Sequence, residues 1–310
     1  MTGPPAARPS TPRPPAARPP APTPLPAPVV DNHTHLDHTR DGDEPFAVAD
    51  ALAAAAAVGV TRLVQIGCEL ASARWTVDVV ERFPQVLGGV ALHPTEASAL
   101  VAAGGEAALA DGLAEIEKLA GHPRVRVVGE TGLDHYWVGA DDVAGRAAQI
   151  TSFRAHIALA KRLGKVLQIH DRDAHDGVLQ VLAEEGAPER TVFHCFSGDA
   201  AMARFCAEQG WYLSFAGTLT FKNAAGLREA ARSVPLEQVL VETDAPYLAP
   251  APHRGRANAG YLVPLTVRCL AEVVGRDLAE VCEQLDATSE RLYGPWNRPV
   301  EALPGVAPEL

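Results

Sequence analysis

The interpretation of the whole chain starts from nine residues near the N-terminus, Val29-Val30-Asp31-Asn32-His33-Thr34-His35-Leu36-Asp37. Val29 and Val30 predict a short buried strand. Side chains two residues apart on a strand point to the same side, so His33 and His35 would share one face at the end of this strand. Two imidazoles in that arrangement form half of a metal site. The alternative is a solvated polar turn that happens to contain histidines.

From Val29 onward, short β-branched runs alternate with stretches rich in Ala, Leu, Glu and Arg. The predicted strands are Val29–Asn32, Arg62–Ile66, Val86–Leu92, Val125–Gly129, Val166–His170, Thr191–His194, Trp211–Phe215 and Val239–Thr243. The predicted helices are Pro45–Val58, Ala71–Phe83, Glu106–Ala120, Val143–Leu163, His175–Glu185, Ala200–Gln209 and Ala224–Arg232, and a last helical region spans Val263–Leu292. Gly and Pro residues at the joins are typical of breaks between elements.

This alternation predicts an α/β fold with parallel strands and right-handed crossovers. Eight strand–helix units are the number that closes a TIM-type (β/α)8 barrel. The alternative, an open doubly wound sheet, is less favoured because no Gly-rich phosphate fingerprint follows any strand. Since we find no repeat and no internal linker, we expect a single barrel domain over residues 29–296 and a C-terminal tail over residues 297–310.

Composition sets limits on the two ends of the chain and on its partners. Residues 1–28 hold 12 of the 26 prolines, and such a Pro/Ala-rich stretch predicts a disordered or polyproline II-like tail. A tether or weak nucleic-acid arm is the alternative. Hydrophobic content of 47% is ample for a core, and a net charge of -11 excludes a strongly basic duplex-binding surface.

The five cysteines show no CxxC spacing and no disulfide-framework pattern. Reduced thiols in a cytoplasmic protein fit this usage best. The chain also shows no signal-peptide pattern and no apolar run of membrane-spanning length, so we expect no membrane partner.

Polar side chains gather where the predicted strands end. Six of them could bind metal: His33, His35, Glu130, His170, His194 and Asp244. In a barrel these strand ends lie on one face around one axis. Burying these imidazoles and carboxylates without partners would cost free energy. Divalent cations would offset this cost, and they explain the types of ligand present. The alternative for any single residue is a hydrogen-bonded polar group in the core.

Six ligands are too many for one open catalytic ion. They suit two ions about 3.5–4 Å apart with a bridging carboxylate. Glu130 lies on the strand between the two histidine groups and is the natural bridge. His33, His35 and Asp244 would hold one ion, because the first and eighth strands are neighbours in a closed barrel.

His170 and His194 would hold the second ion, because the fifth and sixth strands are also neighbours. A water between two such ions would become a nucleophile near neutral pH. Asp244 is the candidate to orient that water and take its proton, which gives Asp244 and Glu130 catalytic roles. Ligand type allows Mg²⁺, Mn²⁺ or Zn²⁺, and four histidines favour transition ions.

Seven segments together resemble the TatD family of metal-dependent deoxyribonucleases, within the amidohydrolase-like barrels. They are Asp31-Asn32-His33-Thr34-His35-Leu36-Asp37, Gly89-Val90-Ala91-Leu92-His93-Pro94, Gly129-Glu130-Thr131-Gly132-Leu133-Asp134, Phe153-Arg154-Ala155-His156-Ile157-Ala158-Leu159-Ala160, His170-Asp171-Arg172-Asp173-Ala174, His194-Cys195-Phe196-Ser197-Gly198 and Glu242-Thr243-Asp244-Ala245-Pro246-Tyr247-Leu248. The resemblance covers residues 29–292. It implies a TIM-like barrel, a two-metal centre and phosphodiester hydrolysis, and the family's ligands carry onto the six residues derived above.

The chain departs from the family pattern in two places. After the eighth strand the family usually has Arg-Gly-Lys-Arg-Asn-Glu-Pro, whereas this chain has Arg254-Gly255-Arg256-Ala257-Asn258-Ala259-Gly260. The acidic residue, the proline and one basic residue are absent, which affects substrate contacts and loop rigidity but removes no metal ligand. His156 stands where family members often have Gln, and we expect it to serve packing.

Four further residues are candidates for binding a substrate phosphate. His93 ends the third strand, Arg172 follows His170, and Lys222 and Arg254 lie in later loops. The alternatives are a capping or packing role for His93 and surface ion pairs for the basic residues.

Two features near the predicted site have competing interpretations. Tyr136 and Trp137 could stack on an unpaired base or form a lid over the barrel. Cys195 beside His194 suggests a thiol nucleophile, but a small buried thiol is the better interpretation because His194 is needed as a ligand.

The sequence therefore predicts a hydrolase that cleaves DNA phosphodiester bonds, an exonuclease acting on ends or single strands. An amidohydrolase-type enzyme acting on a small ester, lactone, amide or phosphotriester would use the same activated water. A non-enzymatic binding partner in DNA processing is the third hypothesis. The open ligand set argues against it, since structural metal sites are usually closed by four ligands.

Overall fold

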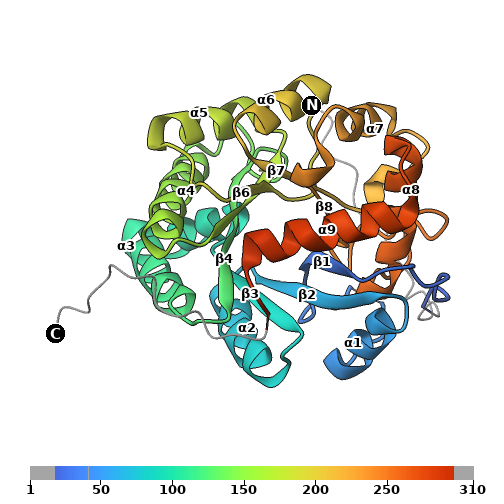
Figure 1. Cartoon of the computed structure of the whole chain (residues 1–310). Helices are drawn as coiled ribbons and strands as arrows, with labels where there is room; N and C mark the ends of the chain where they lie inside the picture. The colour runs from blue at the N-terminus through green and yellow to red at the C-terminus, as the bar shows by residue number, and fades with distance from the viewer. Residues whose placement is uncertain (1–17, 41, 297–310) are drawn as a thin grey trace, which may run out of the picture.

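Eight parallel strands form one sheet in chain order within residues 18–40 and 42–296, which the computed structural model describes (Figure 1). The strands are β1 (Val29–Thr34), β2 (Val60–Gly67), β3 (Val86–Val90), β4 (Val125–Asp134), β5 (Val166–Arg172), β6 (Thr191–Phe193), β7 (Tyr212–Phe215) and β8 (Val239–Val241). A bridge between Thr34 and Ala245 joins the two ends of the sheet. The predicted TIM barrel is confirmed, and the open doubly wound alternative is excluded.

Helices follow the strands and surround the barrel (Figure 1). They are α1 (Val48–Ala56), α2 (Leu70–Arg82), α3 (Pro94–Ala120), α4 (Val143–Leu163), α5 (His175–Glu185), α6 (Ala200–Glu208), α7 (Ala225–Arg232), α8 (Val263–Val274) and α9 (Leu278–Tyr293). Short 3-10 turns cover Gly217–Thr220, Leu236–Gln238 and Gly260–Leu262. Among these described helices, none combines the length and apolarity needed to span a bilayer.

Two helical regions differ from the sequence prediction. Helix α3 begins at Pro94 instead of Glu106, because His93 caps its first turn and the helix continues through a kink at Gly105, where φ is +71°. The predicted helix over Val263–Leu292 is two helices, since Gly275 ends α8 in the left-handed conformation at φ +66°.

Apolar side chains form two cores, one between the sheet and the helices and one inside the barrel. The inner core contains strand residues such as Val64 and Val127, together with Tyr293 and Trp296 from the C-terminal end of α9 and the residues after it. Figure 1 shows α9 lying across the barrel. One end of the barrel is thus filled with apolar side chains, which leaves the opposite end, where the strands finish, for polar groups.

The seam between β8 and β1 uses side chains where the backbone ladder is incomplete. The Nδ2 of Asn32 donates to the carbonyl of Val241 over 2.8 Å, and the Oδ1 of Asn32 accepts from Ser289 on α9. The Asp31 carboxylate accepts from the backbone N–H and the hydroxyl of Thr243, at 2.8 and 2.6 Å. Burial raises the pKa of Asp31 to about 7, against the lowering effect of these bonds.

Residues 18–28 of the predicted disordered or polyproline II-like tail lie against the barrel, while residues 1–17 and the predicted tail at 297–310 lie outside the described residues. Leu25 is buried and its N–H donates to the carbonyl of Val58 over 3.0 Å. The hydroxyl of Tyr261 donates to the carbonyl of Pro19, and the guanidinium of Arg18 lies 4.2 Å from the ring centre of Phe46. Proline-rich backbone keeps its carbonyls free as acceptors, so the barrel can bind this segment without secondary structure.

We expect Asn32→Ala to lower the free energy of unfolding by about 2–3 kcal/mol, because it leaves the carbonyl of Val241 and the hydroxyl of Ser289 with fewer partners inside the protein. Urea titration followed by circular dichroism measures the change. Asn223→Ala, at an exposed position after β7, is the matched control. A loss for Asn32→Ala no larger than that of the control would contradict this account of the seam.

Candidate metal centre

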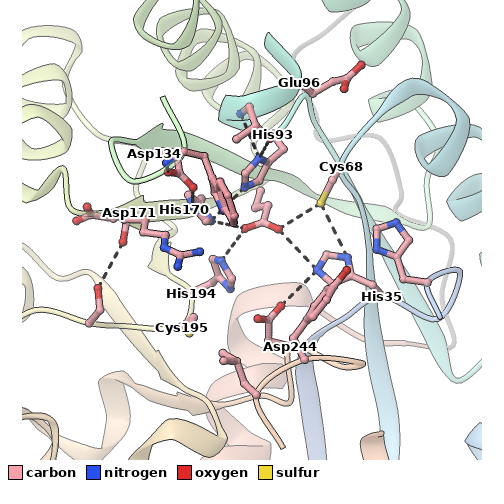
Figure 2. A pocket seen from close by; sticks show the side chains of 18 of the residues that line it. His35, Cys68, His93, Glu96, Asp134, His170, Asp171, His194, Cys195 and Asp244 are labelled. Carbon is pink, nitrogen blue, oxygen red and sulfur yellow. Dashed lines mark hydrogen bonds and ion pairs between the residues drawn. The ribbon is translucent and has the colours of Figure 1, made fainter. Parts of the chain in front are cut away.

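The six predicted ligands lie together at the carboxyl ends of the strands, beside a cavity of about 800 Å³. Five of them line the cavity, and His33 lies buried beneath it. They come from β1 and the residue after it, from β4 and β5, from the residue after β6 and from the turn after β8, which the chain-order sheet brings to one face. Figure 2 shows His35, His170, His194 and Asp244 around this cavity. The structure therefore assembles the whole predicted set.

Glu130 reaches the centre because β4 is irregular at this residue. Gly129 pairs with Gln168 and Thr131 pairs with Ile169, so Glu130 is an extra residue in the ladder. A bulge of this kind turns a side chain out of the regular strand alternation. Position 129 must be glycine, since a Cβ there would lie 2.6 Å from the Cβ of Gln168.

The two oxygens of the Glu130 carboxylate face different groups of imidazoles. Oε1 lies 3.6 Å from the Nε2 atoms of both His33 and His35. Oε2 lies 2.6 Å from the Nε2 of His194 and 2.9 Å from the Nδ1 of His170. One carboxylate thus joins two sets of nitrogen donors.

The first set consists of His33 and His35, and Asp244 lies beside both of them. The Nε2 atoms of His33 and His35 are 3.2 Å apart, and Asp244 Oδ1 lies 3.8 and 3.3 Å from them. Donor atoms that share one ion at about 2.0–2.2 Å stand roughly 3–3.6 Å from each other. The spacing therefore suits a common cation better than it suits direct hydrogen bonding.

Acceptors behind the first set fix which imidazole nitrogen faces the centre. The Nδ1 of His33 lies 2.7 Å from Gln168 Oε1, and the Nδ1 of His35 lies 3.0 Å from the carbonyl of Ile66. Each of these oxygens can accept a hydrogen bond from the Nδ1–H group, which leaves Nε2 directed at the centre, where its lone pair would bind a cation in place of a proton. This is how metal-ligating histidines are normally held.

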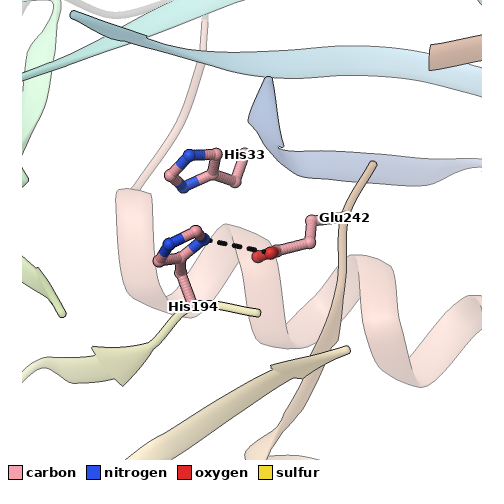
Figure 3. A group of neighbouring side chains, drawn as sticks. All are labelled: His33, His194 and Glu242. Carbon is pink, nitrogen blue, oxygen red and sulfur yellow. Dashed lines mark hydrogen bonds and ion pairs between the residues drawn. The ribbon is translucent and has the colours of Figure 1, made fainter. Parts of the chain in front are cut away.

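The second set is supported in the same way. The Nδ1 of His194 lies 3.1 Å from Glu242 Oε1 (Figure 3). The same oxygen also accepts from the N–H of Cys195. The Nε2 of His170 lies 3.1 Å from Asp134 Oδ2, so this ring offers Nδ1 instead. His33, His194 and Glu242 also form a possible donor group, in which Glu242 Oε1 accepts from the His194 ring and Cys195 while Glu242 Oε2 is buried without a hydrogen-bond partner among the described residues.

Electrostatics favour positive charge at this centre. Burial would lower the pKa of His35, but its hydrogen bond with Asp244 and the charges of Asp244 and Glu130 raise it to about 10. Burial would raise the pKa of Glu130, but the charge of His194 and hydrogen bonds from His170 and His194 hold it well below its usual range. The negative carboxylates stabilise protonated imidazoles beside them. Divalent cations would balance the same negative charge, so the donor set fits a metal.

Sequence reasoning missed Gln168 and Glu242, which orient His33 and His194. A signal for them was present. Each lies two residues before a predicted ligand on the same strand, so strand periodicity directs both toward the barrel axis.

It also missed Cys68 and Asp134. The thiol of Cys68, just after β2, donates to Glu130 Oε1 over 3.2 Å and lies 3.9 Å from the Nδ1 of His35. Burial, followed by the nearby Glu130 charge, raises the pKa of this thiol well above its usual value. Asp134 ends β4 and holds the ring of His170, as described above.

The secondary predictions for His93 and Arg172 both fall at the cavity wall. His93 caps α3 by accepting from the N–H of Thr95, and its Nε2 lies 3.3 Å from the Nδ1 of His170. Burial and the neighbouring His170 lower the pKa of His93 to about 3, so its ring is neutral. Arg172 forms no salt bridge with another described residue, and its guanidinium lies 4.1 Å from the ring centre of Tyr136.

Lys222 and Arg254 are exposed and do not line the cavity in the described part of the chain. The guanidinium of Arg254 lies over the ring of Phe221, 4.5 Å from its centre. The altered loop is nevertheless anchored, since the Nδ2 of Asn258 donates to the carbonyls of Thr243 and Tyr247.

The expected packing role of His156 is confirmed. Its ring is fully buried, its Nε2 accepts from the N–H of Leu92, and its Nδ1 lies 3.0 Å from the hydroxyl of Thr131. For Cys195, burial and three nearby carboxylates raise the pKa of the thiol well above its usual value, which argues against a thiolate nucleophile.

The barrel and its cluster of imidazoles and carboxylates define a metal-dependent hydrolase. The family model described as TatD related DNase matches residues 30–294. The chain belongs to this TatD family, and the predicted resemblance is confirmed.

Relatives and solved structures agree with this assignment. The uncharacterized metal-dependent hydrolase TatD of Mycobacterium tuberculosis is 50% identical over 269 residues, covering 86% of this chain and 98% of that protein. The uncharacterized metal-dependent hydrolase YcfH of Escherichia coli is 34% identical, covering 86% and 95%. The crystal structure of YjjV, a TatD homologue from Escherichia coli, superposes with a TM-score of 0.75 at 23% identity, covering 86% and 98%, which shows a shared fold.

We expect Glu242→Gln to weaken binding of Zn²⁺ or Mn²⁺ by about 10- to 100-fold, because an amide supports the basicity of the His194 ring less well than a carboxylate. Competition with a chromophoric chelator measures the affinity. Glu237→Gln, which removes an exposed carboxylate next to β8, is the control. Equal affinities for the two variants would show that Glu242 does not tune the centre.

Proposed function

We propose that this hydrolase is a deoxyribonuclease that cleaves phosphodiester bonds at DNA ends or in single strands. The observation that carries the proposal is the division of the Glu130 carboxylate between two groups of donors beside an open cavity. Two adjacent cations are the arrangement that phosphodiester-cleaving enzymes use to stabilise both the attacking and the leaving oxygen. The family description supports the same bond type.

Two divalent ions, Mg²⁺, Mn²⁺ or Zn²⁺, are proposed as cofactors. His33, His35 and Asp244 would hold one of them, and His170 and His194 would hold the other. The donor spacings within each set and the position of Glu130 between the sets support this division. When bound, such ions polarise the phosphoryl group and lower the pKa of water.

Asp244 is suited to handle the proton of the attacking water. Its side chain is 16% exposed and faces the cavity. Burial would raise the pKa of its carboxyl, but the hydrogen bond from His35 and the charges of the histidines lower it, so it is ionised at neutral pH. An ionised carboxylate at the cavity wall can accept a hydrogen bond from water and then its proton.

The charge of the chain favours ends and single strands over continuous duplex. A protein with net charge -11 cannot bind many duplex phosphates through a broad basic surface. A recessed cavity admits a strand end more easily than a continuous helix. Arg172 and His93 line that cavity and are the proposed contacts for the phosphate.

The cysteines support a reducing compartment. All five are free, namely Cys68, Cys195, Cys206, Cys269 and Cys282. Since disulfides are rare in the cytosol, a cytoplasmic location is the one we propose.

We expect the wild-type protein to cleave labelled single-stranded DNA with Mg²⁺ or Mn²⁺, to lose this activity with a chelator, and to regain it with metal. His170→Ala should lower the rate at least about 100-fold, because it removes a donor of the second set and a partner of Glu130. Gel electrophoresis of the products gives the rates. His122→Ala, between α3 and β4, is the control.

Absence of cleavage with every divalent ion would contradict the nuclease proposal. A parallel panel of carboxylic esters, lactones, amides and phosphotriesters tests the alternative substrates. Faster turnover of any of these than of DNA would reassign the substrate class while leaving the metal-dependent hydrolase in place.

A further inference from the structure

Two adjacent aromatic side chains stand in solvent at the rim of the cavity. Tyr136 is 56% exposed and Trp137 is 67% exposed, and both follow β4 directly. Trp137 also lines the cavity. Adjacent exposed apolar groups beside a polar cavity are a feature of binding surfaces.

The turn that carries these rings is tied to the metal centre. One oxygen of Asp134 accepts from the backbone N–H groups of Tyr136 and Trp137, at 3.0 and 2.8 Å. Its other oxygen lies 3.1 Å from the Nε2 of His170, a proposed ligand (Figure 2). A single buried carboxylate therefore fixes the distance between the aromatic pair and the centre.

A cation completes the surface. The guanidinium of Arg172 lies 4.1 Å from the ring centre of Tyr136 and 5.8 Å from that of Trp137. The two rings meet edge to face, with centres 5.0 Å apart and planes at 87°. Arg172 lines the cavity two residues after His170 and forms no salt bridge with any side chain in the described part of the chain, so its charge is available to a ligand.

We propose that Tyr136, Trp137 and Arg172 form a platform on which the unpaired nucleobases next to the scissile phosphate stack. This inference rests on the proposed nuclease function and specifies its substrate as single-stranded or frayed DNA. Every base offers a flat face to an aromatic ring, so such binding tolerates any sequence, whereas the bases of an intact duplex are already stacked on each other. Stacking also gives affinity that this acidic protein cannot obtain from many phosphate contacts.

A lid is the competing interpretation of the same rings. A closed lid would bury its rings against the barrel, whereas more than half of each side chain here is exposed.

The test compares Trp137→Ala and Tyr136→Ala with the conservative Trp137→Phe. Phe205→Ala, at an aromatic residue 42% exposed on α6, is the matched control. Each protein is assayed on a single-stranded oligonucleotide and on the same oligonucleotide with abasic residues beside the bonds that the wild type cleaves. We expect Trp137→Ala to lower kcat/KM on the natural oligonucleotide at least about 5-fold, chiefly through KM, and to have no further effect on the abasic one.

Trp137→Phe should retain most of the wild-type value, because a phenyl ring still stacks. The platform is refuted if both alanine variants cleave the natural oligonucleotide as the wild type does, or if they lose equal activity on both substrates.

Binding affinity separates this proposal from the nuclease proposal. It is measured by fluorescence anisotropy of labelled oligonucleotides with the protein in the presence of a chelator, which prevents cleavage. A wild type that cleaves neither oligonucleotide would end the nuclease proposal, and binding would still decide the platform. Weaker binding of the abasic strand, matched by Trp137→Ala on the natural strand, supports the platform. Equal binding of the two strands by the wild type refutes it.

Discussion

The structure depends on one buried carboxylate, Glu130, placed between two groups of imidazoles. A buried negative charge is tolerated only where partners neutralise it, and here those partners come from the ends of several strands. The arrangement holds only if the sheet closes in chain order, with β1 beside β8 and β5 beside β6. The need to balance charge at one point therefore explains why this face of the barrel carries the polar residues.

Strand β1 serves both stability and chemistry within a few residues. Asp31 and Asn32 bond across the seam to β8, to Thr243 just after it and to α9, while His35 lines the cavity and His33 lies buried beneath it. The same closure that stabilises the barrel brings Asp244 to the histidines, since its N–H donates to the carbonyl of His33 over 3.0 Å. The positions of these candidate ligands therefore follow from the hydrogen bonds that join the two ends of the sheet.

Supporting groups complete the centre by fixing orientation. Gln168, the carbonyl of Ile66 and Glu242 each hold the Nδ1 side of an imidazole, while Asp134 holds the Nε2 side of His170. Asp134 also fixes the exposed aromatic turn through two backbone N–H groups. Asp134 therefore fixes both the ring of His170 and the turn at the cavity rim. It links the centre to the surface that a substrate would meet.

The sequence by itself determined the barrel, since strand and helix periodicity and the Gly and Pro breaks are local properties. It also determined which residues stand at the strand ends, namely His33, His35, Glu130, His170, His194 and Asp244. Tertiary structure alone decided the bulge that directs Glu130, the nitrogen that each imidazole presents, the contact of Arg172 with Tyr136, and the docking of residues 18–28. These features depend on register and on partners far apart in the chain. A pattern within one segment contains no information about which carbonyl or carboxylate the fold will place beside it.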